Sequence, residues 1–131
     1  MSVDLLRKLQ LKPGARALVL HAPAGYLAAL AEQLEGVMIA DESTGPHDSA
    51  IVFVDRLADA VARAEQGIAA LRSGGMLWML YPKGSSKVKT NVNRDTLWET
   101  LEETGWQPVR QVSLDAIWSA LRFRPQEEVG R

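Results

Sequence analysis

The sequence contains no cysteine, which excludes disulfide bridges, thiolate zinc sites and a cysteine nucleophile. It also lacks a dominant sign of charge, because 15 Lys and Arg stand against 16 Asp and Glu and the formal net charge at pH 7 is −1. No whole-molecule field draws the chain to nucleic acid or to an anionic membrane, so such binding would need a local patch. The two histidines, His21 and His47, lack ligand spacing, and we expect no metal site.

Long apolar runs are absent as well. No stretch approaches the roughly 18 apolar residues of a membrane span, and the first eight residues are too charged for a secretory signal. We therefore expect a cytoplasmic protein. The length of 131 residues fits one domain, for which we expect an α/β fold over 1–124 and a polar tail over 125–131.

What the sequence does contain is a series of short apolar runs separated by helical patterns. The runs at 15–20, 37–40, 50–54 and 76–80 are typical of strands covered on both faces. Apolar residues alternate with polar ones beyond residue 109, on both sides of a tight turn at 115–116, which predicts an antiparallel hairpin. The sequence thus predicts a three-layer α/β fold whose sheet is mostly parallel, with helices on both faces and an antiparallel C-terminal hairpin.

The helical patterns also assign faces. The clearest helix is expected over 57–71, where four-three spacing should bury Val61 and Ile68 before 73–75 end it. Asn93 is the expected N-cap of the last helix. The inward side chains of that helix are expected to be Leu97, Trp98 and Leu101. The segment 43–49, with glycine and proline, is expected to be a loop.

Four segments, at 11–14, 21–26, 81–84 and 115–123, carry a likeness to known proteins. Through them the chain resembles an uncharacterised bacterial family of small class I methyltransferase-like domains. The resemblance implies a shortened Rossmann-like methyltransferase topology. It brings no catalytic residues, and it implies S-adenosylmethionine as cofactor only if activity is retained.

The chain departs from that pattern in two places. Methyltransferases cradle the cofactor on a loop with several glycines, because the backbone must approach it closely, whereas the matching loop at 21–25 has one glycine. Asp41 stands where an acidic residue would hold the ribose hydroxyls. The eight residues 42–49 are too few for another strand and crossover, which need about 30, so one such unit of the full fold should be missing.

Ligands of such sheets bind beyond the carboxyl ends of the strands, which selects the loops 21–25, 55–56 and 81–92. His21 ends the first strand and is the candidate general base, although a lone histidine is more often structural. The candidate cofactor-binding residues are Gly25, Asp41 and Asp55.

The third of these loops has an uncompensated local charge. From Pro82 to Arg94 inclusive the sequence holds four basic residues and no acidic one, and a helix begins close by with its positive end available. A solvated loop is the plain interpretation, and binding of an anion or a partner is the functional one. The candidate residues for such binding are Lys83, Ser85, Ser86, Lys87, Lys89 and Asn93.

Functions of different classes remain open on these grounds. The glycine-poor first loop favours a non-catalytic binding or interaction domain without a cofactor, whose partner is a protein or a small anionic ligand. Asp41 favours the alternative, a minimal S-adenosylmethionine-dependent methyltransferase. A small enzyme of another kind that uses His21 is the third.

Overall fold

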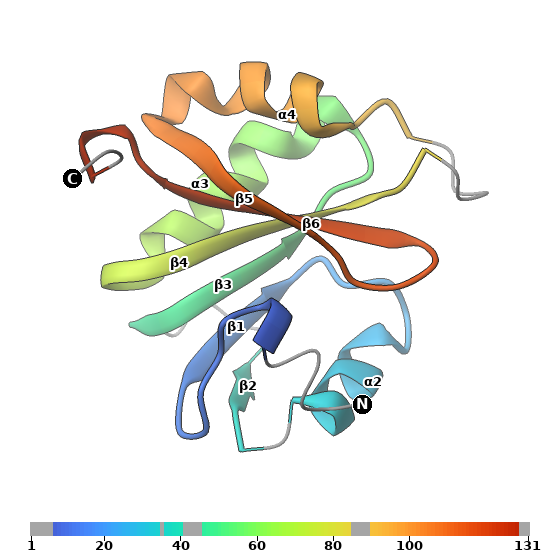
Figure 1. Cartoon of the computed structure of the whole chain (residues 1–131), viewed down its shortest axis with the longest axis vertical. Coiled ribbons are helices and arrows are strands. Elements are labelled where there is room, and N and C mark those ends of the chain that lie inside the picture. The colour runs from blue at the N-terminus through green and yellow to red at the C-terminus, as the bar shows by residue number, and fades with distance from the viewer. Residues whose placement is uncertain (1–6, 35, 41–45, 85–89, 129–131) are drawn as a thin grey trace.

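The computed structural model describes residues 7–34, 36–40, 46–84 and 90–128 (Figure 1). Its centre is a six-stranded sheet in the order β2-β1-β3-β4-β6-β5. The strands are β1 (Arg16–Leu20), β2 (Met38–Ala40), β3 (His47–Phe53), β4 (Leu71–Pro82), β5 (Trp106–Ser113) and β6 (Trp118–Pro125). The helices are α2 (Tyr26–Gln33), α3 (Ala60–Ala69) and α4 (Arg94–Leu101), with short 3-10 turns at Leu57–Asp59, Glu102–Thr104 and Gln126–Glu128.

The strands divide into a parallel part and an antiparallel part. β2, β1, β3 and β4 run parallel, while β6 pairs antiparallel with both β4 and β5. Only six residues, 41–46, separate β2 from β3, too few for a crossover helix. The predicted fold class is confirmed, with the hairpin of β5 and β6 closing a mostly parallel sheet.

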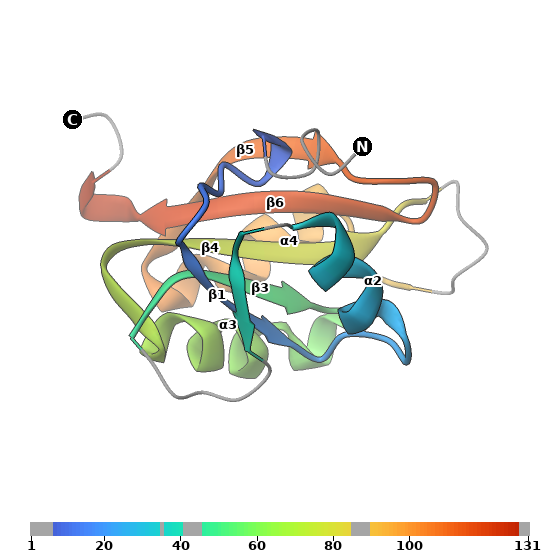
Figure 2. The ribbon, with the colours of Figure 1, turned by 90° about the horizontal axis from the view of Figure 1, so that it is seen from below.

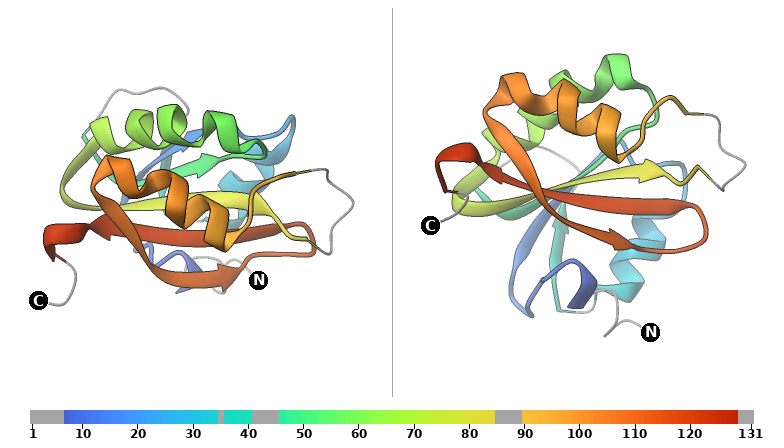
Figure 3. Two further views of the ribbon diagram at one scale, coloured as in Figure 1. Left: turned by 90° about the horizontal axis from the view of Figure 1, so that it is seen from above. Right: turned by 45° about the horizontal axis from the view of Figure 1, so that its top comes forward.

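Helices lie on both faces of the sheet, which makes three layers (Figures 2 and 3). α3 and α4 cover one face, where Leu97 and Leu101 join a core with the inward residues of β3 and β4. α2 and the segment before β1 cover the other, where Leu30 and Leu34 contribute to a second core. Trp78 lies in this second core, and its indole N–H donates to the backbone oxygen of Leu9 at 3.1 Å.

The centre of α3 approaches the sheet more closely than the sequence pattern predicts. Its fully buried positions are Ala60, Ala64 and Gly67, while Val61 and Ile68 are half-buried at the border of the same core. Small side chains bring the helix axis close to the strands, and the larger residues therefore pack to the sides of the contact. The predicted face of the helix is right, but the residues at the centre of that face, which are the most buried, are small.

Several local expectations differ from the structure. His47, in the expected loop 43–49, belongs to β3 and is 1% exposed. The helix over 57–71 ends earlier, at Ala69, because β4 begins at Leu71. Trp98 was expected inside and is 43% exposed.

A bulge explains the early start of β4. Between two pairings with β3, His47 with Leu71 and Ser49 with Met76, β3 advances two residues and β4 advances five. Residues 72–75 therefore bulge out of the ladder, and Gly74 takes a φ of +79° there. In the described part of the chain, no helix is long and apolar enough to cross a membrane.

Candidate functional site

The described residues that follow β1, β3 and β4 lie at the carboxyl edge of the parallel strands, as expected. His21 follows β1 directly, is exposed, and has a φ of +61°, an uncommon conformation for a residue other than glycine. Its Nε2 lies 2.8 Å from Oε1 of Gln66 on α3. This contact holds the imidazole against α3 through the side-chain amide of Gln66. No described carboxylate hydrogen-bonds to the imidazole, as one would if it oriented His21 as a general base.

Gly25 is the N-cap of α2 and has a φ of +80°, in the left-handed region that favours glycine. A Cβ at this position would meet no atom within 4 Å, so the backbone here faces open space. Among the described residues of the loop, Gly25 is the one position where a ligand could approach the main chain without a side chain in between.

Asp55 follows β3 and joins two loops. Its carboxylate lies 4.0 Å from Nη1 of Arg63, and its backbone oxygen accepts from the hydroxyl of Thr90 at 2.8 Å. The side-chain oxygen of Asn91 accepts from the N–H of Leu57 at 2.8 Å. The chain after β4 is thereby tied to the chain after β3.

The start of α4 uses its own capping groups. The Asn93 side chain accepts from the N–H of Thr96 at 2.9 Å, and the Thr96 hydroxyl accepts from the N–H of Asn93 at 2.9 Å. This is a capping box, and the prediction of Asn93 as N-cap is confirmed. The amide oxygen of Asn93 is consequently committed to the helix.

Asp115 connects the hairpin turn to α2. One carboxylate oxygen accepts from the N–H groups of Ile117 and Trp118, both at 2.8 Å, and the other accepts from the Tyr26 hydroxyl at 2.7 Å. Burial alone would raise the pKa of Asp115, but these hydrogen bonds and the nearby charge of Lys83 hold it below its usual range. The group is therefore an anion at neutral pH.

Tyr26 is the neutral member of that pair. Burial raises the pKa of its phenol far above the ordinary value, and the hydrogen bond to Asp115 and its charge act in the same direction. The ring packs edge-on against Phe53 and Trp118, with centroids 5.2 and 6.2 Å away. Trp118 is thus 7% exposed and buried in an aromatic cluster.

Lys83 directly follows β4 and lies beside this cluster. Its Nζ donates to the hydroxyl of Ser113, and its backbone N–H donates to the oxygen of Ile117 at 2.7 Å. Tyr81 and Pro82, expected in the loop, are buried residues of β4. Because β4 extends to Pro82, Lys83 is held against the hairpin.

The structure thus gathers His21, Gly25, Asp55, Lys83 and Asn93 at one edge of the sheet. The other predicted site residues lie outside the described residues; they are Asp41, Ser85, Ser86, Lys87 and Lys89.

The sequence reasoning missed the pair of Tyr26 and Asp115, which are 89 positions apart. Both residues lie in segments that carry the family resemblance, 21–26 and 115–123, and Asp115 lies in a predicted turn, but no sequence signal paired the two. Among the described residues, no group of three or more His, Asp and Glu side chains could hold a metal ion.

No protein family model matches the chain, and no curated protein is similar to it in sequence. Solved structures do match. The ribosomal protein L11 methylase of Lactobacillus delbrueckii subsp. bulgaricus aligns with 95% of this chain and 76% of its own, with a TM-score of 0.60 and 11% identity. The mitomycin 7-O-methyltransferase aligns with 95% of this chain and 53% of its own, with a TM-score of 0.64 and 12% identity.

A further neighbour is an O-methyltransferase from neocarzinostatin biosynthesis, solved with S-adenosyl-L-homocysteine and 1,4-dihydroxy-2-naphthoic acid. It aligns with 83% of this chain and 48% of its own, with a TM-score of 0.62 and 13% identity. The fold is therefore methyltransferase-like. At such identities the likeness concerns the fold alone, and this chain spans about half the length of the two O-methyltransferases.

Proposed function

We propose that this chain is a non-catalytic binding domain of methyltransferase-like fold, whose partner is a protein or a small anionic molecule. The observation that carries the proposal is that polar side chains at the carboxyl edge hydrogen-bond to other side chains of the same domain. His21 contacts Gln66, and Tyr26 donates to Asp115, so the fold itself uses the groups that a catalyst would direct at substrate. The single glycine at 21–25 also gives the backbone little room to approach a cofactor.

The sequence resemblance to an uncharacterised bacterial family of small methyltransferase-like domains supports the proposal. The balanced net charge also supports it, because it gives no reason to propose nucleic acid or a membrane as the partner. We also propose a cytoplasmic location. The partner-binding segment is the basic loop 83–93, which starts at the held Lys83 and ends at the cap of α4.

Titration with inorganic pyrophosphate tests the basic loop, read by amide chemical shifts in nuclear magnetic resonance spectra at low and high salt. We expect shifts at Thr90 and Asn91 that weaken with salt, since exposed charges are screened. The combined Lys83→Ala, Lys87→Ala, Lys89→Ala variant should lose them. A variant that removes three cations away from this loop, Arg7, Lys12 and Arg16, should keep them. Unchanged shifts in the loop variant, with an intact circular dichroism spectrum, would contradict this assignment.

The second candidate is a minimal S-adenosylmethionine-dependent methyltransferase. The neighbours of this fold are methyltransferases, which suits this candidate at least as well as a binding domain. Gly25, with its left-handed φ and open surroundings, would present its backbone to the cofactor, and Asp41 would hold the ribose hydroxyls.

Calorimetry with S-adenosylmethionine and S-adenosyl-L-homocysteine separates the two candidates. For a non-catalytic domain we expect dissociation constants no tighter than about 1 mM, and no change in Asp41→Ala. Micromolar binding that is lost in Asp41→Ala would replace the first candidate with the second.

A further inference from the structure

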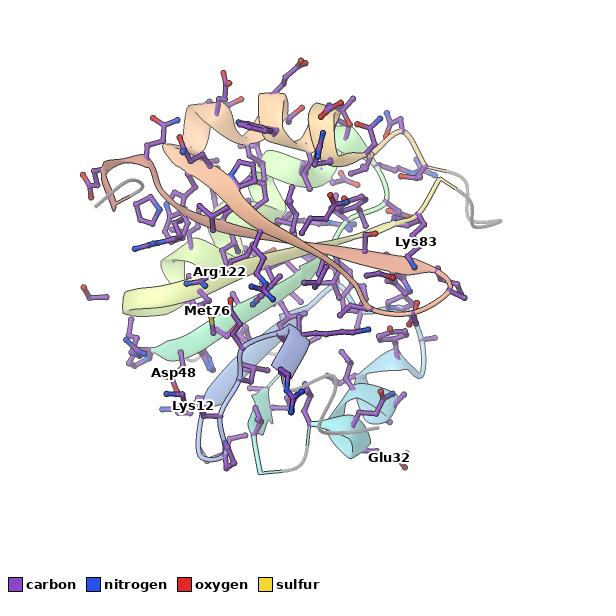
Figure 4. The ribbon with its side chains drawn as sticks, in the orientation of Figure 1. Lys12, Glu32, Asp48, Met76, Lys83 and Arg122 are labelled. Carbon is purple, nitrogen blue, oxygen red and sulfur yellow. The ribbon has the colours of Figure 1, made fainter. Side chains whose placement is uncertain are left out.

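A second group of charged side chains lies at the opposite, amino edge of the parallel strands, around a cavity of about 450 Å³. Its charged lining residues are Lys12, Asp48, Arg72 and Arg122, which come from the segment before β1 and from β3, β4 and β6. Figure 4 shows Lys12, Asp48 and Arg122 on the same side of the molecule as Met76, whereas Lys83 lies at the far end of β4. The cavity is therefore separate from the carboxyl edge.

Arg122 is the least expected of these residues, because it is half-buried, and a guanidinium withdrawn from water is normally paired with an anion. Its Nη1 donates to the side-chain oxygen of Gln10 at 2.7 Å, a neutral acceptor. Its Nε is buried and has no hydrogen-bond partner, and no described carboxylate lies within 4.0 Å of its guanidinium. The positive charge of Arg122 is thus left without a counterion by the described part of the chain.

Neighbouring arginines increase this positive charge. Arg110 of β5 is the direct cross-strand partner of Arg122, an arrangement of like charges that destabilises a sheet. Burial lowers the pKa of Arg122, and the charges of Arg124 and Arg110 lower it further. A bound anion would relieve both the desolvation and the repulsion.

The bulge in β4 completes the wall of the cavity. Within it, Arg72 donates from Nε to Asp48, and Asp48 also accepts from the backbone N–H of Arg16 at 2.8 Å. The hydrogen bond from Arg72 holds the pKa of Asp48 below its usual range, and the hydrogen bond from the Arg16 backbone acts in the same direction. Asp48 therefore neutralises Arg72, and Lys12 and Arg122 leave the lining with a net positive charge.

The rest of the lining is apolar or bare backbone. Leu11, Ala15 and Met76 contribute apolar surface, and Gly14 and Gly74 both have positive φ. A Cβ at Gly14 would meet no atom within 4 Å, so the main chain is accessible there. The volume lies in the range of small-molecule sites, which combine apolar walls with a few charged groups.

We infer that this cavity binds a small organic anion, with its phosphate or carboxylate group on Arg122 and Lys12 and its apolar part on Leu11 and Met76. The forked guanidinium suits both kinds of anion, because it can donate two parallel hydrogen bonds. The buried, unpartnered Nε of Arg122 shows that the described part of the chain leaves this guanidinium under-satisfied.

Nuclear magnetic resonance with three probes tests the inference and distinguishes the two anionic groups. The probes are phenyl phosphate, benzoate and inorganic phosphate, and the signals followed are the Nε–H of Arg122 and the backbone amides of Gly14 and Gly74. We expect phenyl phosphate or benzoate to shift all three signals, with a dissociation constant near 1 mM or tighter. Inorganic phosphate should bind at least about fivefold more weakly, because it has no apolar part.

Two variants and one control sharpen the test. Arg122→Gln should abolish the shifts at both glycines. Lys12→Glu, at an exposed position where folding is not at risk, should weaken binding by about tenfold or more, because it reverses a charge of the lining. Arg94→Gln, which removes an exposed cation paired with Asp95 on α4, should leave the affinity unchanged.

Two results would overturn the inference. One is the absence of shifts in all three signals at about 10 mM of each probe, a concentration that would saturate a millimolar site. The other is stronger binding of a single-stranded oligonucleotide, with shifts spread over Arg7, Lys8 and Arg110 and a steep salt dependence, because that pattern belongs to an extended nucleic-acid surface. Neither result bears on the basic loop at the carboxyl edge, whose amides are followed separately.

Discussion

At the scale of single residues, His47 carries a titratable ring into the start of β3, where it is 1% exposed. Neither ring nitrogen has a hydrogen-bond partner among the described residues. Burial lowers the pKa of His47 below the ordinary 6.5, Arg16 lowers it further, and Asp48 opposes them. The folded chain therefore holds the imidazole neutral at a pH where the unfolded chain protonates it.

We predict that the free energy of unfolding falls as the pH is lowered from about 7 through 5. In that window the unfolded state binds more protons than the folded state, so stability decreases on acidification, by at most about 1.4 kcal/mol per pH unit for one group. Urea denaturation at several pH values measures the slope. His47→Leu should flatten it, whereas His21→Gln, at an exposed position, should leave it in place. If His47→Leu had the same pH slope as the wild type, the slope would have to come from other titratable groups.

Tyr26 provides the second prediction at this scale. Tyr26→Phe keeps the ring contacts with Phe53 and Trp118 but removes the hydrogen bond to Asp115, so we expect a loss of about 1.5 kcal/mol at pH 7. The pKa of Asp115 is held down in the folded state, so its stabilisation is present above the ordinary 3.8 and is lost as the pH falls through the folded pKa.

The difference between wild type and Tyr26→Phe should therefore shrink in acid, below about pH 3.8. Chemical denaturation at pH 7 and pH 3 measures both values. Equal stability of the two proteins at pH 7 would show that the hydroxyl contributes nothing to the turn.

At the scale of elements, the contact of α3 with the sheet depends on Gly67. A Cβ there would lie 2.9 Å from Cγ2 of Val52 and 3.2 Å from both Cβ of Ala50 and Cδ1 of Leu77. The first two neighbours can move little, because a β-branched side chain is stiff and a Cβ is fixed by its backbone. Close approach therefore outweighs the general preference for alanine in helices.

We predict that Gly67→Ala destabilises the protein by about 1 to 3 kcal/mol, although alanine gains about 1 kcal/mol in helix propensity. Thermal or chemical denaturation measures the change. Ala62→Gly, at an exposed position of the same helix, is the matched control and should cost about 1 kcal/mol from propensity alone. A stabilised Gly67→Ala would mean that the helix does not approach the strands so closely.

At the scale of the whole molecule, both cores depend on the same strands. Inward residues of one face, such as Val52 and Leu77, alternate along β3 and β4 with residues of the other, such as Ile51 and Trp78. Neither helical layer can lose its packing without exposing a face of the shared sheet.

We therefore predict a single cooperative unfolding transition, as is usual for domains of this size. Tryptophan fluorescence reports on the tertiary packing of both cores, because Trp78 and Trp118 lie in the second core and Trp106 packs against the first. Far-ultraviolet circular dichroism reports on the helices and the sheet. Their denaturation curves should coincide. Separate midpoints would show that one layer unfolds first.

The sequence determined the larger part of the fold, because its signals are local. Apolar runs identified the four parallel strands, and the alternation of apolar and polar residues identified the hairpin. Asn93 caps a helix and Asp115 lies in the hairpin turn, as their side-chain chemistry predicts. The same local signals failed at Trp98 and His47, because burial depends on what lies opposite a residue and not on its neighbours in the chain.

Tertiary structure alone decided which charged and polar groups meet. Tyr26 and Asp115, 89 positions apart, and Gln10 and Arg122, 112 apart, are joined by pairing between β4 and β6 and by the packing of the N-terminal segment over them. The extra residues of the bulge placed Arg72 against Asp48 and formed a wall of the amino-edge cavity. Chain periodicity fixes which face a residue occupies, but register between strands fixes its partner, and register is set by the packing of the whole sheet.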